Sequence, residues 1–130
     1  MIFFSRHRWR YAQRLLGIVL GSDIGAKFGE NLRMPHPYGI IIHSGTVFGR
    51  NVVVMHQVTI GARDLSNRAP VIGDDVYIGA GAKILGDIRL GHRCMVGANA
   101  VVTKDVPDDC TVVGANRILK QKSGADSLLR

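Results

Sequence analysis

A repeat of six residues runs through the sequence from residue 42 to residue 102. Small or aliphatic residues recur four positions after the repeating residue, and a glycine directly follows it at six positions. Neither the 3.6-residue period of a helix nor the two-residue period of a strand produces this spacing. The repeating residue is large and apolar in every case but Ser66: Ile42, Phe48, Val54, Ile60, Ser66, Ile72, Ile78, Ile84, Leu90, Val96 and Val102.

A period of six fits a coil with three sides, so that three repeats make one rung. Ile24, Ile42, Ile60, Ile78 and Val96 are each separated by three repeats, so we expect them to stack in one column of the core. We expect glycine to relieve crowding where the chain bends, because it tolerates unusual backbone angles. A rung buries its apolar side only against its neighbours. The period therefore predicts an all-β coil of several stacked rungs.

Interruptions of the repeat divide the chain into three parts. Residues 1–22 lack the period and predict a short basic helix, with Trp9, Leu16 and Leu20 as its packing residues. Residues 23–120 form the expected coil. Within it, residues 62–70 carry charge, asparagine and proline where aliphatic residues belong, and predict an excursion loop. The phase is lost after Pro107, and residues 121–130 are expected to form a tail.

Composition and charge narrow the classes of function. No apolar run approaches the roughly 18 residues that span a bilayer, and Leu15–Leu20 is too short for a secretory core. We therefore expect a cytoplasmic protein, and membrane contact has no direct support. The net charge of +7 would attract polyanions, including a phosphate-rich cofactor. Aromatic residues are only 6% and are not interleaved with basic ones, so nucleic-acid binding is not expected.

The candidate reactive residues are His36 and the two cysteines, Cys94 and Cys110. His36 occupies a position in phase with the repeat, where an aliphatic side chain belongs. Pro35 and Pro37 flank it and restrict the backbone, so we expect the imidazole to turn outward. Cys94 falls in an inward phase and is expected to be an inert core thiol, whereas Cys110 lies beyond the repeat, where it could be exposed. Their spacing does not suit a zinc site.

Several segments together resemble a known family. They are Gly21–Gly29, His36–Ile42, Val58–Gly61, Ile78–Gly86, Val96–Pro107 and Val113–Ile118. The chain resembles the hexapeptide-repeat acyltransferases over residues 20–120. Within that family it resembles the serine acetyltransferase-like branch, close to the exopolysaccharide (colanic-acid type) O-acetyltransferases. The resemblance implies a left-handed parallel β-helix, against the usual right-handed crossover.

The resemblance also implies an activity and a set of site residues. The activity is direct transfer of an acetyl group from acetyl-CoA to a hydroxyl, without a metal, in a cleft between subunits of a homotrimer. His36 matches the general base that accepts the hydroxyl proton. Arg68 and His56 are expected to contact the acceptor, although His56 alternatively orients His36. Residues expected to bind acetyl-CoA are Gly61, Ala80 and Ala98 along the groove, and Lys104, Arg117 and Lys120 at the phosphates.

Departures from the serine-specific pattern favour a sugar or polysaccharide precursor as the acceptor. Pro35 replaces an aspartate, Ala69 replaces a loop histidine, and the large N-terminal helical domain is not in this sequence. L-serine, as in cysteine biosynthesis, is the alternative acceptor, and a non-catalytic β-helix scaffold is the alternative from another class. A zinc site at His36, His43 and His56 is disfavoured, because the His-x4-His pair of related zinc enzymes is missing. His92 is expected to be a plain surface residue.

Overall fold

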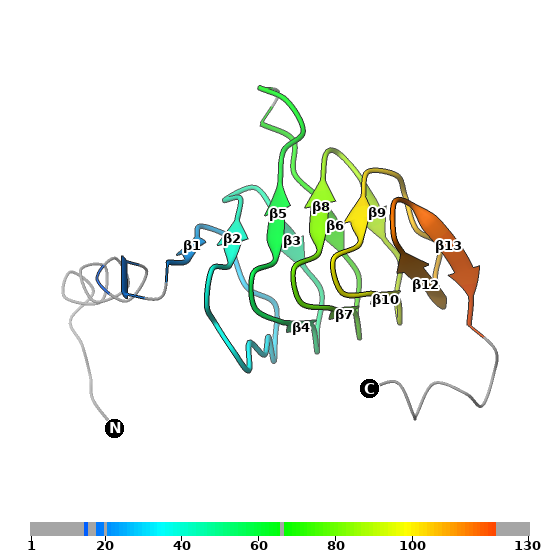
Figure 1. The fold of residues 1–130 in the computed structure, drawn as a ribbon, viewed down its shortest axis with the longest axis horizontal. Coiled ribbons are helices and arrows are strands. Elements are labelled where there is room, and N and C mark those ends of the chain that lie inside the picture. Colours follow the sequence, from blue (N-terminus) through cyan, green and yellow to red (C-terminus); the bar gives the residue numbers. More distant parts are fainter. Residues whose placement is uncertain (1–14, 16–17, 20, 66, 122–130) are drawn as a thin grey trace.

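Short strands wind around a common axis in the computed structural model, which describes residue 15 and residues 18–19, 21–65 and 67–121 (Figure 1). The strands form three sheets. Sheet A consists of β1 (Asp23–Ile24), β2 (Ile41–Ile42), β5 (Thr59–Gly61), β8 (Lys83–Leu85) and β11 (Val101–Val102). Sheet B consists of β3 (Val47–Phe48), β6 (Val71–Ile72) and β9 (Arg89–Leu90). Sheet C consists of β4 (Val53–Val54), β7 (Tyr77–Ile78), β10 (Met95–Val96), β12 (Cys110–Val113) and β13 (Arg117–Lys120).

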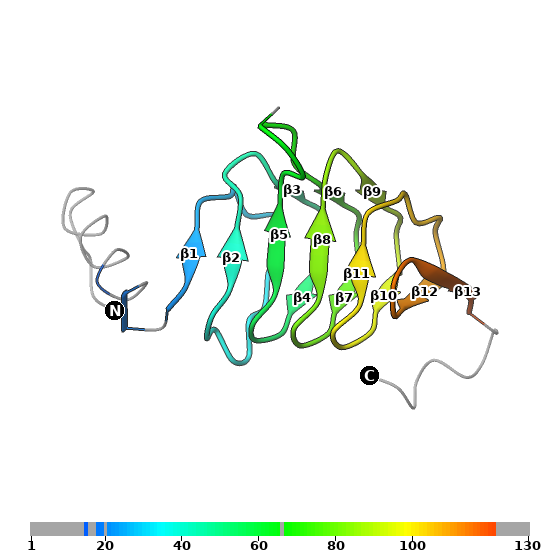
Figure 2. The same cartoon turned by 45° about the horizontal axis from the view of Figure 1, so that its top comes forward.

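Each rung adds one parallel strand to each sheet. In sheet A, β1 pairs with β2 and β2 with β5 at a spacing of three repeats, so that Ile24, Ile42 and Ile60 stack as expected. The expected column is wrong beyond Ile60, which pairs with Ile84 because the loop of the next rung adds six residues. Ile78 and Val96 stack instead in sheet C. Figure 2 shows the strands of sheet A rising in front while the chain returns behind them and advances toward the C-terminal end. This path is a left-handed screw, and the predicted parallel β-helix is confirmed.

The repeating apolar residues fill the interior of the coil. Each inward residue contacts the same position of the rungs above and below, so burial depends on stacking and not on any single strand. Replacing one such residue, for example Ile78, by alanine is expected to cost about 2–5 kcal/mol. The buried residues of the main phase are Ile42, Phe48, Val54, Ile60, Ile72, Ile78, Ile84, Leu90, Val96 and Val102, and those of the second phase include Thr46, Val52, Val58, Val76, Ala82, Ile88, Cys94, Ala100 and Val106.

The repeated glycines serve close stacking more than unusual backbone angles, which corrects the sequence-based expectation. A Cβ on Gly49 would lie 2.7 Å from the backbone of Gly73, and a Cβ on Gly73 would lie 2.9 Å from that of Gly91. None of these three glycines has a positive φ. The positive φ values at this corner belong to later residues such as Asn51 and Asp75. Glycine is therefore required here because successive rungs approach too closely for a side chain.

The first described rung departs from the regular repeat. Ile41 pairs with Thr59, at the regular spacing of three repeats, whereas Arg33 bridges to Val53, at a spacing two residues longer. The connection that contains His36 is therefore two residues longer than the corresponding connection in the next rung. These two extra residues account for the departure from the regular coil that the sequence predicted around His36.

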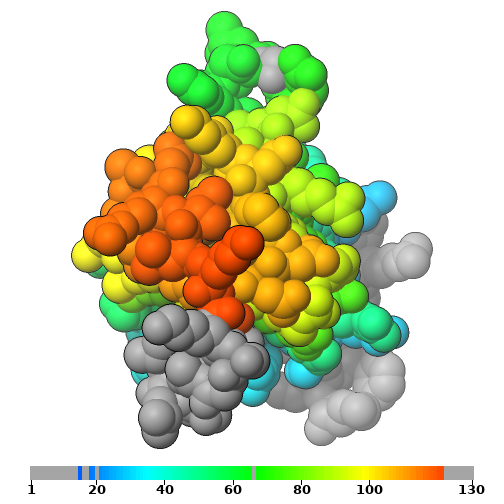
Figure 3. Space-filling model, turned by 90° about the vertical axis from the view of Figure 1, so that its right-hand side faces the viewer, coloured from blue at the N-terminus to red at the C-terminus, as the bar shows by residue number. Residues whose placement is uncertain are grey.

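The C-terminal end of the coil also differs from the expectation. The repeat does not end at Pro107, because β12 pairs with β10 and continues sheet C. Leu90 bridges to Val106, at a spacing two residues shorter than three repeats, so the phase shifts but the burial persists. Cys110 is consequently buried, at 5% exposure. The antiparallel hairpin of β12 and β13 covers this end of the coil (Figure 3).

Most of the predicted N-terminal helix lies outside the described residues, including Trp9, Leu16 and Leu20. Leu15, Ile18 and Val19 are described, are helical and are exposed. Within the described part of the chain, no helix is long and apolar enough to cross a membrane.

Candidate active site

His36 lies at the edge of the coil where the chain passes from sheet C to sheet A. We call this edge the His36 corner; it consists of residues 35–39, 55–57, 79–81 and 97–99. His36 is exposed, as the interruption of the repeat predicts. Pro35 and Pro37 restrict the backbone on both sides of it. The side chain is therefore carried on a stiff, widened turn and is open to a ligand.

His56 is the neighbour of His36 on the next rung. The two ring centroids are 6.2 Å apart and the ring planes lie at 80°, an edge-to-face arrangement. His56 is half-buried, and its carbonyl accepts a hydrogen bond of 2.9 Å from the Gly81 N–H. Two imidazoles therefore meet at this corner, one exposed and one anchored to the body of the coil.

Ala80 and Ala98 continue the line of His56 along the coil. The Gly81 N–H donates to the His56 carbonyl and the Asn99 N–H donates to the Ala80 carbonyl, so the three positions stack rung by rung. Among the described residues, neither the Ala80 nor the Ala98 N–H has a hydrogen-bond partner. Small side chains and unpaired donors thus continue along the His36 corner on the rungs beyond His56, an arrangement that suits the amides of an extended ligand.

The loop corner is the opposite end of the sheet A strands and consists of residues 43–46, 62–70, 86–88 and 103–105. The loop between β5 and β6 stands out from the coil in its described residues, 62–65 and 67–70 (Figures 1 and 3). Arg68, in this loop, donates from Nη1 to the Asp87 carboxylate at 3.1 Å. Both side chains are more than half exposed. Lys104 is also exposed at this corner, after the end of β11.

Gly61 ends β5 and differs from the other repeat glycines. A Cβ placed on it would meet only Leu85 Cδ2, at 4.0 Å, and its φ is not positive. Neither packing within the chain nor backbone conformation therefore requires glycine there. A glycine that the fold itself does not require, and that borders a pocket, indicates that a ligand or another backbone approaches closely there.

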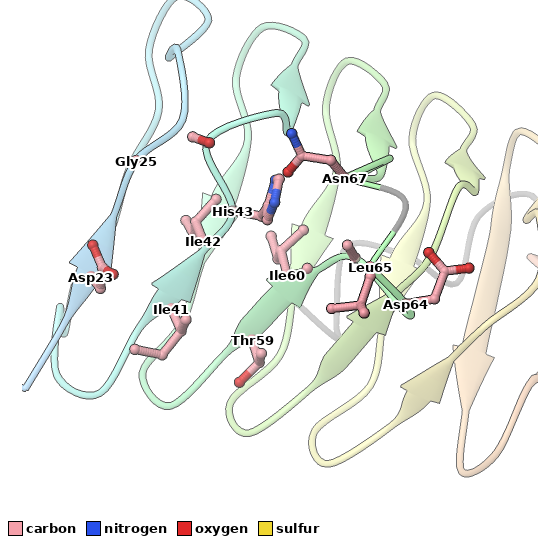
Figure 4. Close-up of a pocket in the computed structure, with 13 residues that line it drawn as sticks. Asp23, Gly25, Ile41, Ile42, His43, Thr59, Ile60, Asp64, Leu65 and Asn67 are labelled. Carbon is pink, nitrogen blue, oxygen red and sulfur yellow. The ribbon is translucent and has the colours of Figure 1, made fainter.

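The pocket beside Gly61 has a volume of about 790 Å³ and lies on sheet A next to the loop. Figure 4 shows His43 and Asn67 on one side of it and Asp64 and Leu65 on the loop. Sequence reasoning missed Asp23 and Thr59, which also line it. The sequence feature that could have identified them is a polar residue directly before an inward-facing aliphatic residue. That position places the polar side chain on the outer face of the strand. Arg68 lies in a separate pocket of about 170 Å³.

The predicted residues thus fall into two groups. His36, His56, Ala80 and Ala98 share the His36 corner, while Gly61, Arg68 and Lys104 lie at or beside the loop corner. Arg117 begins β13, where it is exposed and pairs with Val113, whose side chain lies against Gly97 of the His36 corner. One chain does not bring Arg68 to His36, because the strands of sheet A separate them.

His92 is not the plain surface residue that the sequence suggested. Its Nδ1 accepts a hydrogen bond of 2.9 Å from the Asp74 N–H and lies 3.7 Å from the Asp74 carboxylate. The backbone N–H of Arg50 donates to that carboxylate and lowers the pKa of Asp74. This cluster joins rungs at the corner between sheets B and C, away from His36, and its role is structural.

No group of three or more potential metal ligands occurs among the residues that the structure describes. His36 and His56 meet, whereas His43 lies at the other end of sheet A, where its Nδ1 accepts the Gly45 N–H at 3.0 Å. The residues present therefore give no support to a zinc centre.

Comparisons with known proteins bear on the family. Residues 69–104 match the family model for bacterial transferase hexapeptide (six repeats). The chain is 40% identical over 118 residues to a serine acetyltransferase of Mycobacterium tuberculosis (strain ATCC 25618 / H37Rv), a match that covers 82% of this chain and 52% of the relative.

Solved structures give the same result. The serine acetyltransferase of Neisseria gonorrhoeae in complex with serine is 41% identical, with a TM-score of 0.75 over 82% of this chain and 45% of that one. A serine acetyltransferase in complex with CoA is 35% identical, with a TM-score of 0.76 over 85% of this chain and 47% of that one.

The chain spans about half the length of the curated relatives it matches. The expected closeness to exopolysaccharide O-acetyltransferases finds no support in these matches, which are serine acetyltransferases. The six-residue repeat, the left-handed coil and the match of residues 69–104 identify a hexapeptide-repeat fold, and over most of its own residues the chain is similar to serine acetyltransferases.

Proposed function

We propose that the protein transfers an acetyl group from acetyl-CoA to a hydroxyl, with L-serine as the first acceptor to test. The observation that carries the proposal is the exposed imidazole of His36 on its widened turn, at the same corner as the small residues Ala80 and Ala98. The similarity to structures solved with serine and with CoA supports both substrates. It favours serine over the sugar that the sequence alone suggested.

The proposed reaction needs one base and a place for the thioester. His36 accepts the proton of the acceptor hydroxyl while the oxygen attacks the thioester carbon. The new C–O bond forms, the C–S bond then breaks, and the departing CoA thiolate takes the proton back from the imidazolium. The unpaired N–H groups of Ala80 and Ala98 provide donors for the amides of the pantetheine arm.

The acceptor group is proposed to meet Arg68 of a neighbouring subunit. His36 and Arg68 lie at opposite ends of the sheet A strands of one chain, so a site that uses both requires a second copy. A cyclic homotrimer supplies such a contact three times. Arg68 would then exchange its ion pair with Asp87 for an anionic group of the acceptor. Gly61 and Lys104 would face acetyl-CoA from the same side, and Arg117 would approach its phosphates.

A sugar hydroxyl is the second candidate acceptor. The specific observation in its favour is the absence of ionisable side chains at positions 35 and 69, which are Pro35 and Ala69. Of the residues predicted to contact the acceptor, only Arg68 carries a fixed positive charge. The carboxylate of an acceptor such as serine would then have Arg68 alone as its charged partner among them.

Thiol release from acetyl-CoA tests the proposal, with L-serine in one series and sugars and sugar nucleotides in another. We expect turnover with L-serine and its loss in His36→Ala. Turnover only with sugars would move the acceptor to the second candidate. Absence of both turnover and CoA binding would instead support a non-catalytic scaffold.

Complementation tests the shared site. His36→Ala and Arg68→Ala are each expected to be inactive alone. Refolding the two variants together should restore part of the activity, because some interfaces then combine an intact His36 corner with an intact loop corner. No restoration in mixed oligomers would place both residues in the same subunit's site or exclude one of them.

A further inference from the structure

The imidazole of His36 has no polar partner in the described part of the chain. It forms no hydrogen bond and no ion pair with the described residues, and its one ring contact there is with His56. Pro35 and Pro37 restrict the backbone, but they leave the side-chain torsions of His36 free. Something else must therefore hold the ring in one orientation if its nitrogen is to meet a hydroxyl.

His56 is suited to that task because it is itself anchored. It is half-buried on a complete rung, and its carbonyl accepts the N–H of Gly81 from the next rung. At the two equivalent positions further along the coil the side chain is alanine, in Ala80 and Ala98. The stacking of the coil therefore does not need a large side chain there, and the ring of His56 is not required to fill space.

The geometry of the pair supports an orienting contact. The centroid separation of 6.2 Å and the interplanar angle of 80° fall within the range of edge-to-face ring pairs, which hold one ring against the face of another. The distance depends on the widened turn. With the regular spacing of three repeats, His36 would stack on Val54, an inward residue, and the two rings would not face each other at the surface.

We propose that His56 is a positioning residue that holds the His36 ring by edge-to-face packing, rather than a residue that contacts the acceptor. This inference rests on the proposed acetyl transfer for its catalytic consequence. The step itself is unchanged, since the proton still moves between the acceptor, His36 and the CoA thiolate. His56 restricts the orientations of the base before the acceptor arrives, which favours a productive arrangement.

Two substitutions separate ring packing from polar contact. His56→Ala removes the ring, and His56→Phe keeps an aromatic ring without nitrogen atoms. We expect His56→Ala to lower kcat about tenfold with the KM values for acceptor and acetyl-CoA within about twofold, because only the orientation of the base is lost. His56→Phe should restore kcat to within about threefold of wild type. His92→Ala, which removes an imidazole from another corner, should leave kcat within about twofold.

A second readout does not depend on activity. In protein with isotope-labelled histidine, the ring protons of His36 should show nuclear Overhauser contacts to His56 and a ring-current shift. That shift should disappear in His56→Ala and persist in His56→Phe, with unfolding temperatures unchanged. The inference would be overturned if the resonances of His36 did not change in His56→Ala. It would also be overturned if His56→Ala raised the KM for the acceptor and left kcat unchanged. If no acceptor gives turnover but the ring contact is observed, the acetyl-transfer proposal fails while the positioning of His36 stands.

Discussion

Two glycines at the same phase of the repeat should respond in opposite ways to alanine. Gly73 lies between rungs, where a Cβ would approach the backbone of Gly91 and His92 at 2.9–3.0 Å. Those backbone atoms belong to the next rung and cannot rotate away. Gly61 has an ordinary backbone conformation and an added Cβ would meet only Leu85 Cδ2 at 4.0 Å.

The magnitudes follow from these contacts. Overpacking a rigid interior costs about 1–3 kcal/mol, so Gly73→Ala should lower the unfolding free energy by that amount. Gly61→Ala should change it by less than about 0.5 kcal/mol or raise it by up to about 1 kcal/mol, because alanine reduces the entropy of the unfolded chain. For a chain of this size the first change lowers Tm by several degrees, at roughly 4 °C per kcal/mol.

Urea unfolding followed by circular dichroism measures both variants under identical conditions. Gly114→Ala is the matched control for backbone strain, since Gly114 has φ +57 and no atom within 4 Å of an added Cβ. It should lose about 1 kcal/mol through its left-handed backbone alone. Equal losses in Gly61→Ala and Gly73→Ala would refute the argument that close approach of rungs sets the glycine pattern. In the proposed enzyme, Gly61→Ala should also raise the KM for acetyl-CoA.

Three further outcomes are expected. Thr46 Oγ1 is buried without a hydrogen-bond partner among the described residues, so Thr46→Val should raise the unfolding free energy by about 1 kcal/mol in urea titrations; a loss would mean that the hydroxyl is satisfied. The hydrogen bond from Arg93 lowers the pKa of Asp109, so the stabilisation is present above the ordinary pKa of an aspartate and is lost as the pH falls below about 4. Asp109→Asn should therefore flatten the acid end of a plot of stability against pH, and an unchanged slope would contradict this. Burial raises the pKa of the Cys94 thiol, so a thiol reagent should label Cys94 at pH 8 only on unfolding; rapid labelling of the native protein would show that it is accessible.

The sequence was sufficient to predict the coil, because its period dictates which residues face inward whatever the details of each corner. Ile42 and Ile60 stack as the spacing of three repeats requires, whereas Ile60 pairs with Ile84 and not with Ile78, because the excursion loop adds one repeat to that rung. The phase shifts near Pro107 and His36 could not be predicted in the same way. Their lengths depend on turn conformations, which a two-residue change alters without disturbing the inward residues on either side.

The candidate site was predictable as a set of residues but not as an arrangement. His36 stood out because an imidazole replaced an aliphatic residue in the repeat. That His56 orients His36 was one of two roles expected for it, but the repeat did not predict how the rings meet, since their separation along the chain does not match the repeat and they meet only because the turn is widened. The ion pair of Arg68 with Asp87 joins an excursion loop to the next rung, and loop geometry carries no periodic signal.

The proposed acetyl transfer depends on His36 as its base. The most direct measurement is the initial rate of CoA thiol release with L-serine, compared between wild type and His36→Ala at equal CoA binding. If His36 is the base, His36→Ala should lower kcat about 100-fold or more, with a similar dissociation constant for CoA. Equal rates in the two proteins would contradict it.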